Sequence, residues 1–496
     1  MDELLLGIDI GSSSTRGVLA RADGTPVAQA ERRHGLSLPR PGWVEHDAEK
    51  VWWRDLCSIA RELAPRAGAA LKAVCVSGIG PCVVLCDAEL RPLRPAILYG
   101  IDTRAHEEIA ELEERYGIDA LLARGGSALS SQAIGPKMLW LRRHEPELWE
   151  CTTGWYMASS FVAARLTGEY VLDHHSASQC DPLYDMQSVA WADDMIEEIA
   201  PGVPFPRLTW PGETVGAVTA AAAGETGLPE GIAVANGTVD AWAEAFSAGV
   251  RRPGEVMVMY GTTMFFVQAV ARATPHRSLW FTQGIQPGAP TLAAGMSTSG
   301  ALTEWLRDLV GRPAWDELLE ESRQVPAGSR GLLLLPYFEG ERTPIYDHNA
   351  RGTVTGLTLS HGRAELLRAS YEGIACGVRQ VLDTFTAAAS PASRVVAIGG
   401  GTRSSLWTQI VSDVTGAEQH MPEVTLGASY GDALLAAIGT GLVPPDTDWS
   451  NTGEIVRPDA ENAEVYEEVF QLYGELYPAT KDIVHRLVAL QQRDGR

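Results

Sequence analysis

The chain opens with Leu4-Leu5-Leu6-Gly7-Ile8-Asp9-Ile10, passes through Gly11-Ser12-Ser13-Ser14-Thr15-Arg16 and becomes apolar again at Gly17-Val18-Leu19-Ala20. This order predicts a buried strand over 4–10, a turn of small residues and an antiparallel partner strand over 17–20. Backbone N–H groups, the hydroxyls of Ser12 and Ser13 and the Arg16 guanidinium could bind phosphate oxygens, while Asp9 could hold Mg²⁺ or its waters. The alternative is an ordinary hairpin whose Ser and Thr side chains satisfy the turn.

A similar plan recurs about halfway along the chain. Val256-Met257-Val258-Met259 has the pattern of a strand and leads into the turn Tyr260-Gly261-Thr262-Thr263. Two matched turns, one in each half, could bind a polyphosphate from both sides. We therefore expect an α/β chain with two related domains facing each other across a cleft, where small-molecule sites commonly lie. The stretch between Gly224 and Gly254, rich in Ala, Gly and Pro, is the expected boundary region.

Two further segments could carry chemistry. Val395-Val396-Ala397-Ile398 predicts a buried strand, followed by the turn Gly399-Gly400-Gly401 and a helix that begins near Ser404. Glycines in that turn would let a flat ring or a ribose approach the backbone, although the triplet could also be a tight strand-to-helix connection. Asp240 lies between an apolar strand and a small-residue helix. It could accept a proton from a substrate hydroxyl, or it could cap the helix.

The composition excludes several function classes. Among 496 residues, 40 Lys and Arg stand against 63 Asp and Glu, which gives a formal net charge of −23. Nucleic acids and anionic membranes are therefore not expected partners, since both need a basic footprint. No apolar run is long enough for a transmembrane helix, and no basic leader precedes the first strand. The seven cysteines lack metal-binding spacing, and reduced thiols in the cytoplasm are the expected state.

Taken together, these segments resemble the FGGY family of carbohydrate kinases along nearly the whole chain. The opening Gly7–Gly11 and Ser13–Arg16 are similar to the first phosphate motif of that family, and Pro41–Asp47 is similar to its early loop. Pro136–Leu141 matches the core of the first family signature, although Gln132 and Ile134 before it depart from the usual pattern. Gly340–Pro344 and the run from Gly352 to Glu372 match the second signature and the segment that precedes it.

The resemblance implies a fold, a reaction and a set of site residues. The fold would be a pair of duplicated ribonuclease H-like domains of the actin/hexokinase ATPase type, with 1–240 mainly for the sugar and 241–460 mainly for ATP. A C-terminal helix over 461–496 is expected to pack back on the first domain, and a homodimer is the family-level expectation. Asp240 would be the catalytic base and Asp9 would place Mg²⁺. The implied contacts to ATP and its phosphates are Ser12, Ser13, Arg16, Gly261, Thr262, Thr263, Thr298, Gly399, Gly400, Gly401 and Ser404.

The acceptor is less well defined by the sequence. The general similarity is to xylulokinases, through Leu93–Tyr99 and Asp102-Thr103-Arg104. Xylulokinases carry Gln-Met-His-Gly after the strand, whereas here Ser77-Gly78 leads into Ile79-Gly80-Pro81-Cys82. They also follow the catalytic Asp with Asn, whereas this chain has Ala241. The Arg-Glu pair of glycerol kinases is absent too. The lost polar groups would read substrate hydroxyls, so D-xylulose, another ketose, a polyol or a deoxy-sugar all fit. The candidate substrate contacts are Gly80, Pro81, Cys82, Asp102 and Asp240, with a helix cap as the alternative role of Asp102.

Two other function classes remain open at this level. One is a catalytically idle sensor of sugar or nucleotide on the same scaffold, since a fold does not guarantee activity. The other is a sugar-independent ATPase that uses nucleotide as a conformational switch. Asp9, Asp240 and both phosphate turns favour an active kinase over the first, and the base at Asp240 favours it over the second.

Overall fold

The computed structural model describes residues 3–494, and these form two compact units. The first unit combines Met1–Arg251 with Trp280–Thr291 and Leu426–Ser450, and the second combines Arg252–Leu279 with Leu292–Thr425 and Asn451–Arg496. The expected boundaries after residues 240 and 460 differ from this division. The reason is that residues 426–450, far along the chain, fold into the first unit.

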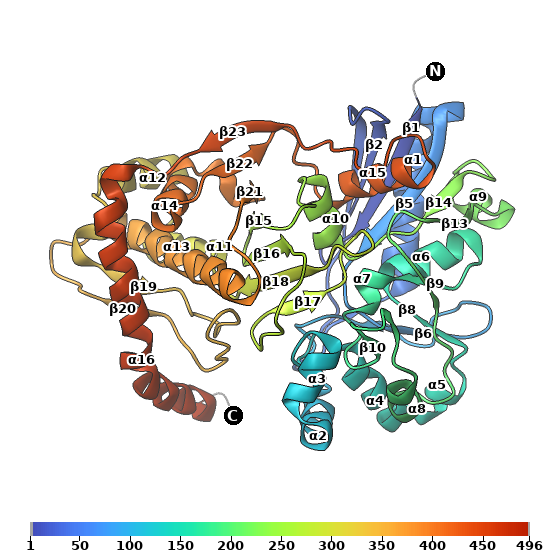
Figure 1. Cartoon of the computed structure of the whole chain (residues 1–496), viewed down its shortest axis with the longest axis horizontal. Helices are drawn as coiled ribbons and strands as arrows, with labels where there is room; N and C mark the ends of the chain where they lie inside the picture. The colour runs from blue at the N-terminus through green and yellow to red at the C-terminus, as the bar shows by residue number, and fades with distance from the viewer. Residues whose placement is uncertain (1–2, 495–496) are drawn as a thin grey trace. The chain divides into compact units, whose positions relative to one another are not determined.

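A six-stranded sheet forms the centre of the first unit (Figure 1). Its order is β13 (Thr214–Ala217), β14 (Ala233–Ala235), β5 (Leu71–Gly78), β1 (Leu4–Ile10), β2 (Ser14–Arg21) and β3 (Pro26–Arg33). β1 runs antiparallel to β2 and parallel to β5. The first strand and its hairpin partner are thus confirmed, and the partner begins at Ser14, three residues earlier than expected.

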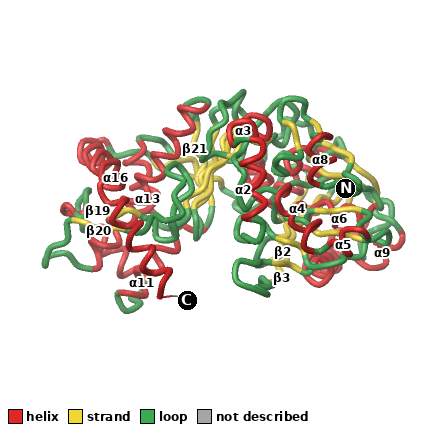
Figure 2. Tube along the Cα trace, turned by 90° about the horizontal axis from the view of Figure 1, so that it is seen from below, coloured by secondary structure: helices red, strands yellow, loops and turns green. Residues whose placement is uncertain are grey.

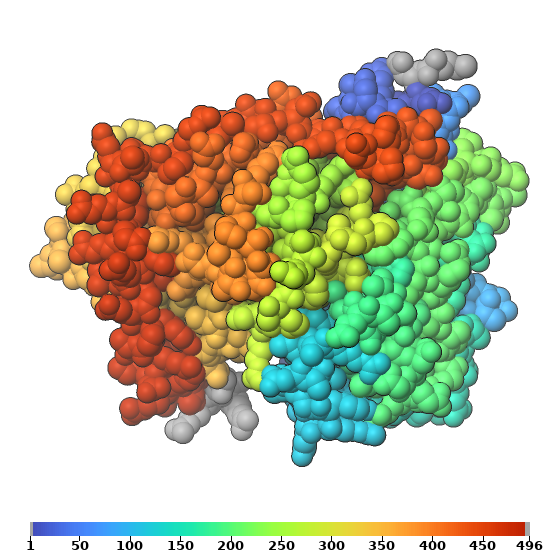
Figure 3. Space-filling view, viewed as in Figure 1, coloured from blue at the N-terminus to red at the C-terminus, as the bar shows by residue number. Residues whose placement is uncertain are grey.

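Helices cover both faces of this sheet, which explains why nearly every residue of β1 is buried. Gly7 faces α15 (Ala428–Gly439), because a Cβ atom there would lie 1.9 Å from the Ser429 carbonyl oxygen. Gly17, which pairs with Ile8 and so points to the opposite face, lies against α1 (Arg54–Ala67). In Figures 1 and 3 the orange-red α15 segment lies directly on the blue N-terminal strands.

The remaining elements of the first unit surround that core. Short strands pair as β4 (Glu45–His46) with β7 (Ala96–Ile97), β6 (Val84–Cys86) with β8 (Gly154–Tyr156), β9 (Val171–Asp173) with β12 (Arg207–Thr209), and β10 (Tyr184–Asp185) with β11 (Ala190–Trp191). The segment Trp280–Thr291 contributes β17 (Trp280–Thr282). The further helices are α2 (His106–Tyr116), α3 (Ile118–Gly125), α4 (Ile134–His144), α5 (Pro146–Glu150), α6 (Ala158–Thr167), α7 (His174–Ala177), α8 (Asp193–Ile199), α9 (Ala220–Thr226) and α10 (Asp240–Ser247).

The second unit repeats the plan of the first sheet. Its strands follow the order β18 (Thr291–Met296), β16 (Met264–Ala269), β15 (Glu255–Tyr260), β21 (Arg394–Ile398), β22 (Gln419–Pro422) and β23 (Thr452–Val456). β15 is antiparallel to β16 and parallel to β21, as β1 is to β2 and β5. The similarity between the two halves of the sequence therefore corresponds to one strand arrangement built twice.

Five helices and a small hairpin complete the second unit. They are α11 (Gly300–Leu309), α12 (Trp315–Arg323), α13 (Arg363–Ala388), α14 (Ser405–Thr415) and α16 (Ala463–Asp494), with β19 (Leu333–Leu335) paired to β20 (Thr353–Thr355). α16 packs on α13, α14 and β19, and Figure 2 shows it beside that hairpin. α16 thus belongs to the second unit, and the expected packing of this helix on the first domain stays a prediction. Within residues 3–494, no helix is long and apolar enough to cross a membrane.

Candidate functional site

Asp9 lies at the carboxyl end of β1, between Arg16 on β2 and Ser77 on β5 in the strand register. The following turn is closed by a hydrogen bond from Gly11 N to Ser14 O of 3.0 Å, and His34 braces it through Nε2 and Gly11 O at 3.0 Å. Ser12 is half-buried and Ser13 is exposed. The Arg16 guanidinium is exposed and forms an ion pair with Glu31 at 3.1 Å, so the structure holds it near the turn by a surface contact.

Four acidic side chains gather near the end of β1. Burial raises the pKa of Asp9 well above its usual range, and the neighbouring Asp240, Asp432 and Glu244 raise it further. Burial raises the pKa of Asp240 to about 6. Glu244 lies one helical turn beyond Asp240 on α10, and burial together with Asp240 raises its pKa to about 7. The structure therefore brings the two predicted acids, Asp9 and Asp240, into one electrostatic cluster.

Asp240 is the first residue of α10, directly after the chain leaves β14 and Gly237. Its Oδ1 atom accepts a hydrogen bond of 2.7 Å from the N–H of Ala241, and the residue is half-buried. A Cβ atom at Gly237 would lie 1.8 Å from the Val76 carbonyl oxygen, so this segment approaches β5 as closely as a backbone can. The position of Asp240 is therefore fixed by the start of α10 and by the close packing of Gly237 on β5.

Asp432, like Glu244, is an acid of this cluster that the sequence does not reveal. It is fully buried on α15, and its Oδ2 atom accepts hydrogen bonds from Ser77 N at 3.1 Å and from Ser77 Oγ at 2.6 Å. Burial raises its pKa well above the usual range, and Asp240 adds to that effect. The only sequence signal is an Asp within the otherwise apolar helix from Ala428 to Gly439. Its contact with a strand 355 residues earlier could not be read from the sequence.

The predicted acceptor loop lies beside the same cluster. Gly78 N donates to Thr238 O at 3.0 Å and Ile79 N donates to Ile10 O at 2.7 Å, which ties the loop to the ends of β1 and β14. A Cβ atom at Gly80 would lie 2.7 Å from the Val239 side chain, next to Asp240. Pro81 is buried, and the buried Cys82 thiol donates to Ile79 O at 3.2 Å. Gly80, Pro81 and Cys82 are thus placed near Asp240, and they offer few free polar groups.

Asp102 has a different environment from the other predicted contacts. It is 1% exposed, and its carboxylate accepts hydrogen bonds from Arg104 Nε and Nη2 at 2.7–3.1 Å and from Val44 N at 2.7 Å. Arg104 in turn binds Glu45 at 2.8 Å. Both oxygens of Asp102 are therefore engaged in a buried ion-pair network, which favours a structural role over contact with a substrate.

In the second unit, the turn after β15 is joined to the start of α11. Gly300 N donates to Gly261 O at 3.1 Å, and Ser299 N and Ala301 N donate to Thr262 O at 3.2 and 3.1 Å. Thr262 and Thr263 are exposed. Thr298 is 3% exposed, and within the described part of the chain its hydroxyl has no hydrogen-bond partner. This turn and the N-terminus of α11 together present hydroxyl and N–H groups, which suit phosphate oxygens.

The glycine turn after β21 packs against the same strand end. Gly399 has a φ of 92°, and a Cβ atom there would lie 2.6 Å from the Tyr260 carbonyl oxygen. A Cβ atom at Gly401 would lie 2.6 Å from the Trp407 ring, whereas one at Gly400 would meet nothing within 4 Å. Ser404 caps α14 by accepting from Trp407 N at 3.3 Å. Gly399 and Gly401 are thus required by close packing, and Gly400 leaves backbone open for a ligand.

The residues fit a magnesium nucleotide better than a metal held by protein alone. Among residues 3–494 no group of three or more His, Cys, Asp or Glu side chains could hold a metal ion. Mg²⁺ usually takes one or two carboxylates and completes its shell with water and phosphates. The buried Oδ1 atom of Asp9, which lacks a hydrogen-bond partner within the described residues, suits such a role.

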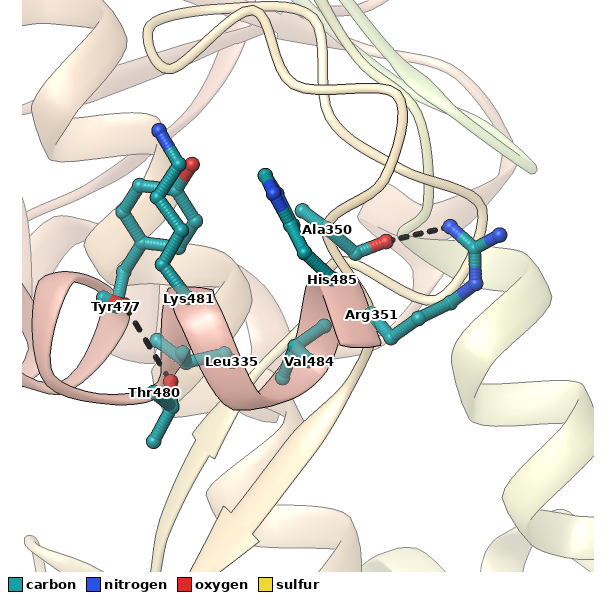
Figure 4. A pocket seen from close by; sticks show the side chains of 8 residues that line it. All are labelled: Leu335, Ala350, Arg351, Tyr477, Thr480, Lys481, Val484 and His485. Atoms are coloured by element: carbon teal, nitrogen blue, oxygen red, sulfur yellow. Dashed lines mark hydrogen bonds between the residues drawn. The ribbon is translucent and has the colours of Figure 1, made fainter. Parts of the chain in front are cut away.

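A separate small pocket lies in the second unit beside α16 (Figure 4). Its walls come from β19, the loop at Ala350 and the helix segment 477–485, and Arg351 is held by a 2.7 Å hydrogen bond to Ala350 O. None of the predicted site residues lines it. The pocket marks where α16 is anchored and is not a candidate for the reaction.

Comparison with known proteins agrees with this arrangement. Residues 4–247 match the N-terminal domain and residues 256–440 the C-terminal domain of the FGGY family of carbohydrate kinases. The chain is 28% identical to the xylulose kinase of Bacillus subtilis (strain 168) over 490 residues, which cover 97% of each protein. It is also 28% identical to the glycerol kinase of Nocardia farcinica (strain IFM 10152) over 478 residues, 92% of each. The crystal structure of xylulose kinase from Rhodospirillum rubrum superimposes with a TM-score of 0.90 at 34% identity, covering 97% of this chain and 100% of that one.

The fold and these matches define an enzyme that phosphorylates sugars and takes its phosphate from ATP. The chain belongs to the FGGY family of carbohydrate kinases. The family resemblance, the α/β fold class and the enzyme class that the sequence predicts are confirmed.

Proposed function

We propose that this kinase transfers the γ-phosphoryl group of ATP to a hydroxyl of D-xylulose or of a related ketose, polyol or deoxy-sugar. Asp240 takes the proton of that hydroxyl as its oxygen attacks the γ-phosphorus, and the bond between phosphorus and the β,γ-bridging oxygen breaks to release ADP. The observation that supports the proposal is that Asp240 interacts electrostatically with Asp9, while the preceding residue, Val239, packs against Gly80.

The other residues position the reactants. In the first unit, the residues that bind phosphate oxygens are Ser12, Ser13 and Arg16. In the second unit, they are Gly261, Thr262, Thr263 and Thr298, and the residues that lie against adenosine are Gly399, Gly400, Gly401 and Ser404. When bound at Asp9, Mg²⁺ neutralises charge on the phosphates. Asp102 is left out of the acceptor site because both of its oxygens are already engaged.

The acceptor class follows from the loop beside Asp240. Pro81 has no N–H, the Cys82 thiol donates to Ile79 O, and Ala241 replaces a residue that could bind a hydroxyl. Sites that read a hydroxyl with a buried polar group discriminate strongly, whereas apolar walls discriminate weakly. We therefore expect the enzyme to tolerate acceptors that lack one hydroxyl of D-xylulose.

The test is ADP release with Mg·ATP and a panel of pentuloses, hexuloses, pentoses, polyols and deoxy-sugars. We expect turnover that requires an acceptor and falls by at least about 10²–10⁴-fold in Asp240→Ala, with ATP binding retained. Asp193→Ala is the matched control, because Asp193 is the first residue of α8 and is exposed. Normal turnover in Asp240→Ala would refute its role as base. Nucleotide binding without turnover on any acceptor would favour a sensor, and ADP release without an acceptor would favour a nucleotide switch.

A further inference from the structure

The segment Gly340–Pro344 is bonded to the end of β18, immediately before the residues that lead into α11. Glu341 is 1% exposed, and its Oε1 atom accepts hydrogen bonds from Ser297 N at 2.7 Å and Arg342 N at 2.8 Å. Thr343 N donates to Gly295 O at 3.1 Å. A Cβ atom at Gly295 would lie 3.0 Å from the Arg342 guanidinium carbon. The two segments are therefore fixed against each other almost residue by residue.

A second set of hydrogen bonds continues from this junction to the phosphate turn. Two residues beyond Ser297, the Ser299 hydroxyl donates to Gly261 O at 3.0 Å, and Gly300 N donates to the same oxygen at 3.1 Å. A Cβ atom at Gly300 would lie 2.5 Å from Gly261 O, so the two backbones touch. A displacement of Ser297 would therefore also displace the turn Gly261–Thr263, because the two segments are tightly packed.

A buried carboxylate at position 341 is unusual, because burying an ionisable group costs free energy. Its second oxygen, Oε2, is buried and has no hydrogen-bond partner within residues 3–494. Burial raises the pKa of the Glu341 carboxyl to about 7, although its hydrogen bonds from the N–H groups of Ser297 and Arg342 oppose that rise. In its ionised form, above that pH, it binds these N–H groups roughly twice as strongly as a neutral acceptor would. The Glu341 carboxylate thus loses its hydration on burial, but it binds the N–H of Ser297 strongly and keeps Ser297 in place.

We propose that Glu341 is a positioning residue for nucleotide binding: it holds Ser297 so that the turn Gly261–Thr263 and the N-terminus of α11 meet the phosphates of ATP. The inference rests on the proposed function, in which those elements bind the phosphates. Because Glu341 acts through the phosphate turn, its loss weakens binding of the triphosphate and leaves binding of the adenosine moiety unchanged. A purely structural role would lower stability without this selectivity.

The test uses Glu341→Gln in the full chain at pH 8, above the pKa of about 7 to which burial raises Glu341, since glutamine keeps the shape and one acceptor oxygen but cannot ionise. Calorimetric titration with the Mg²⁺ complex of a non-hydrolysable ATP analogue is expected to show about five- to tenfold weaker binding, with adenosine binding unchanged. Glu372→Gln is the matched control. Glu372 is 2% exposed in the same unit and accepts from Gly328 N, Arg368 Nε and Tyr466 OH at 3.0 Å and from Ser329 Oγ at 2.7 Å, and none of these partners lies in 295–301.

Each outcome bears on a different statement. Equal affinity of the ATP analogue for the unaltered chain and Glu341→Gln would overturn the inference and leave the kinase proposal intact. An equal loss for the analogue and for adenosine would also overturn it, because the effect would not act through the phosphates. No binding of the analogue by the unaltered chain would overturn both. If Glu341→Gln fails to fold, Glu341→Asp, which keeps the charge on a shorter side chain, must show the same selective loss.

Discussion

The ionisation of Asp240 sets the pH range in which the proposed base can work. Burial raises its pKa to about 6, so the carboxylate is protonated below that pH and free to accept a proton above it. We expect kcat/KM for the acceptor to be constant above about pH 7 and to fall about tenfold per pH unit well below 6, because kcat/KM reports the ionisation of the enzyme without acceptor. A profile of kcat/KM for the acceptor from pH 5 to 9, at saturating ATP, measures this limb. A constant kcat/KM down to pH 5 would contradict the assignment.

The sequence predicts the residues whose role depends on local pattern and misses those whose role depends on distant contacts. Asp9 and Asp240 each end a strand or start a helix within a recognisable motif, and the structure brings them together. The sequence gives no sign that Glu244 belongs to the cluster, because a glutamate on a helix is usually solvated. The role of Asp432 could not be predicted either, because its hydrogen-bond partner, Ser77, is 355 residues away in the sequence. Asp102 lies in a family-like motif, yet its oxygens are engaged by Arg104 and Val44.

Among the contacts between elements, the close packing of α15 on β1 gives a direct test of the fold. A methyl group at Gly7 would approach Ser429 O to 1.9 Å and Ala433 N to 2.4 Å, and these are backbone atoms that cannot rotate away. We therefore expect Gly7→Ala to lower the free energy of unfolding by about 3 kcal/mol or more. Urea unfolding followed by circular dichroism measures the change.

Gly35→Ala is the control for that substitution. Gly35 is exposed, and a Cβ atom there would meet nothing within 4 Å. We expect its free energy of unfolding to stay within about 0.5 kcal/mol of the unaltered chain. If Gly7→Ala were equally neutral, α15 could not lie on β1 as closely as the structure places it.

The elements themselves were largely predictable, because strand and helix patterns are local. The apolar runs at 4–10, 256–260 and 395–398 correspond to β1, β15 and β21. The last helix, α16, continues from Ala463 to Asp494 although Pro478 lies inside it. The packing of α16 on α13 and α14, and of α15 on β1, depends on contacts between distant segments, which a local pattern does not reveal.

At the scale of the whole molecule, the first unit is built from three separate segments of the chain, so a fragment with only the first segment should be unstable. Residues 1–251 lack α15, whose buried residues include Leu434, Leu435 and Tyr430, so the sheet face that α15 covers would be open to water. We expect this fragment to aggregate or to unfold without a cooperative transition in a thermal scan. Joining residues 280–291 and 426–450 to it through flexible linkers is the control and should restore cooperativity. A cooperative transition of 1–251 alone at the temperature of the joined fragment would contradict the assignment of α15 to this unit.

The position of α15 also bears on how the protein is made. On the ribosome, residues 1–251 emerge long before residues 426–450, and at about 5–20 residues per second the interval lasts roughly 10–35 s. During that time β1 and β5 expose the apolar surface that α15 will cover, and Ser77 has not yet met Asp432. We therefore expect this apolar surface of the nascent first half to attract chaperones until translation is almost finished. Codon changes that slow elongation between residues 252 and 425 would lengthen this exposure and lower the yield of folded enzyme without altering a single amino acid.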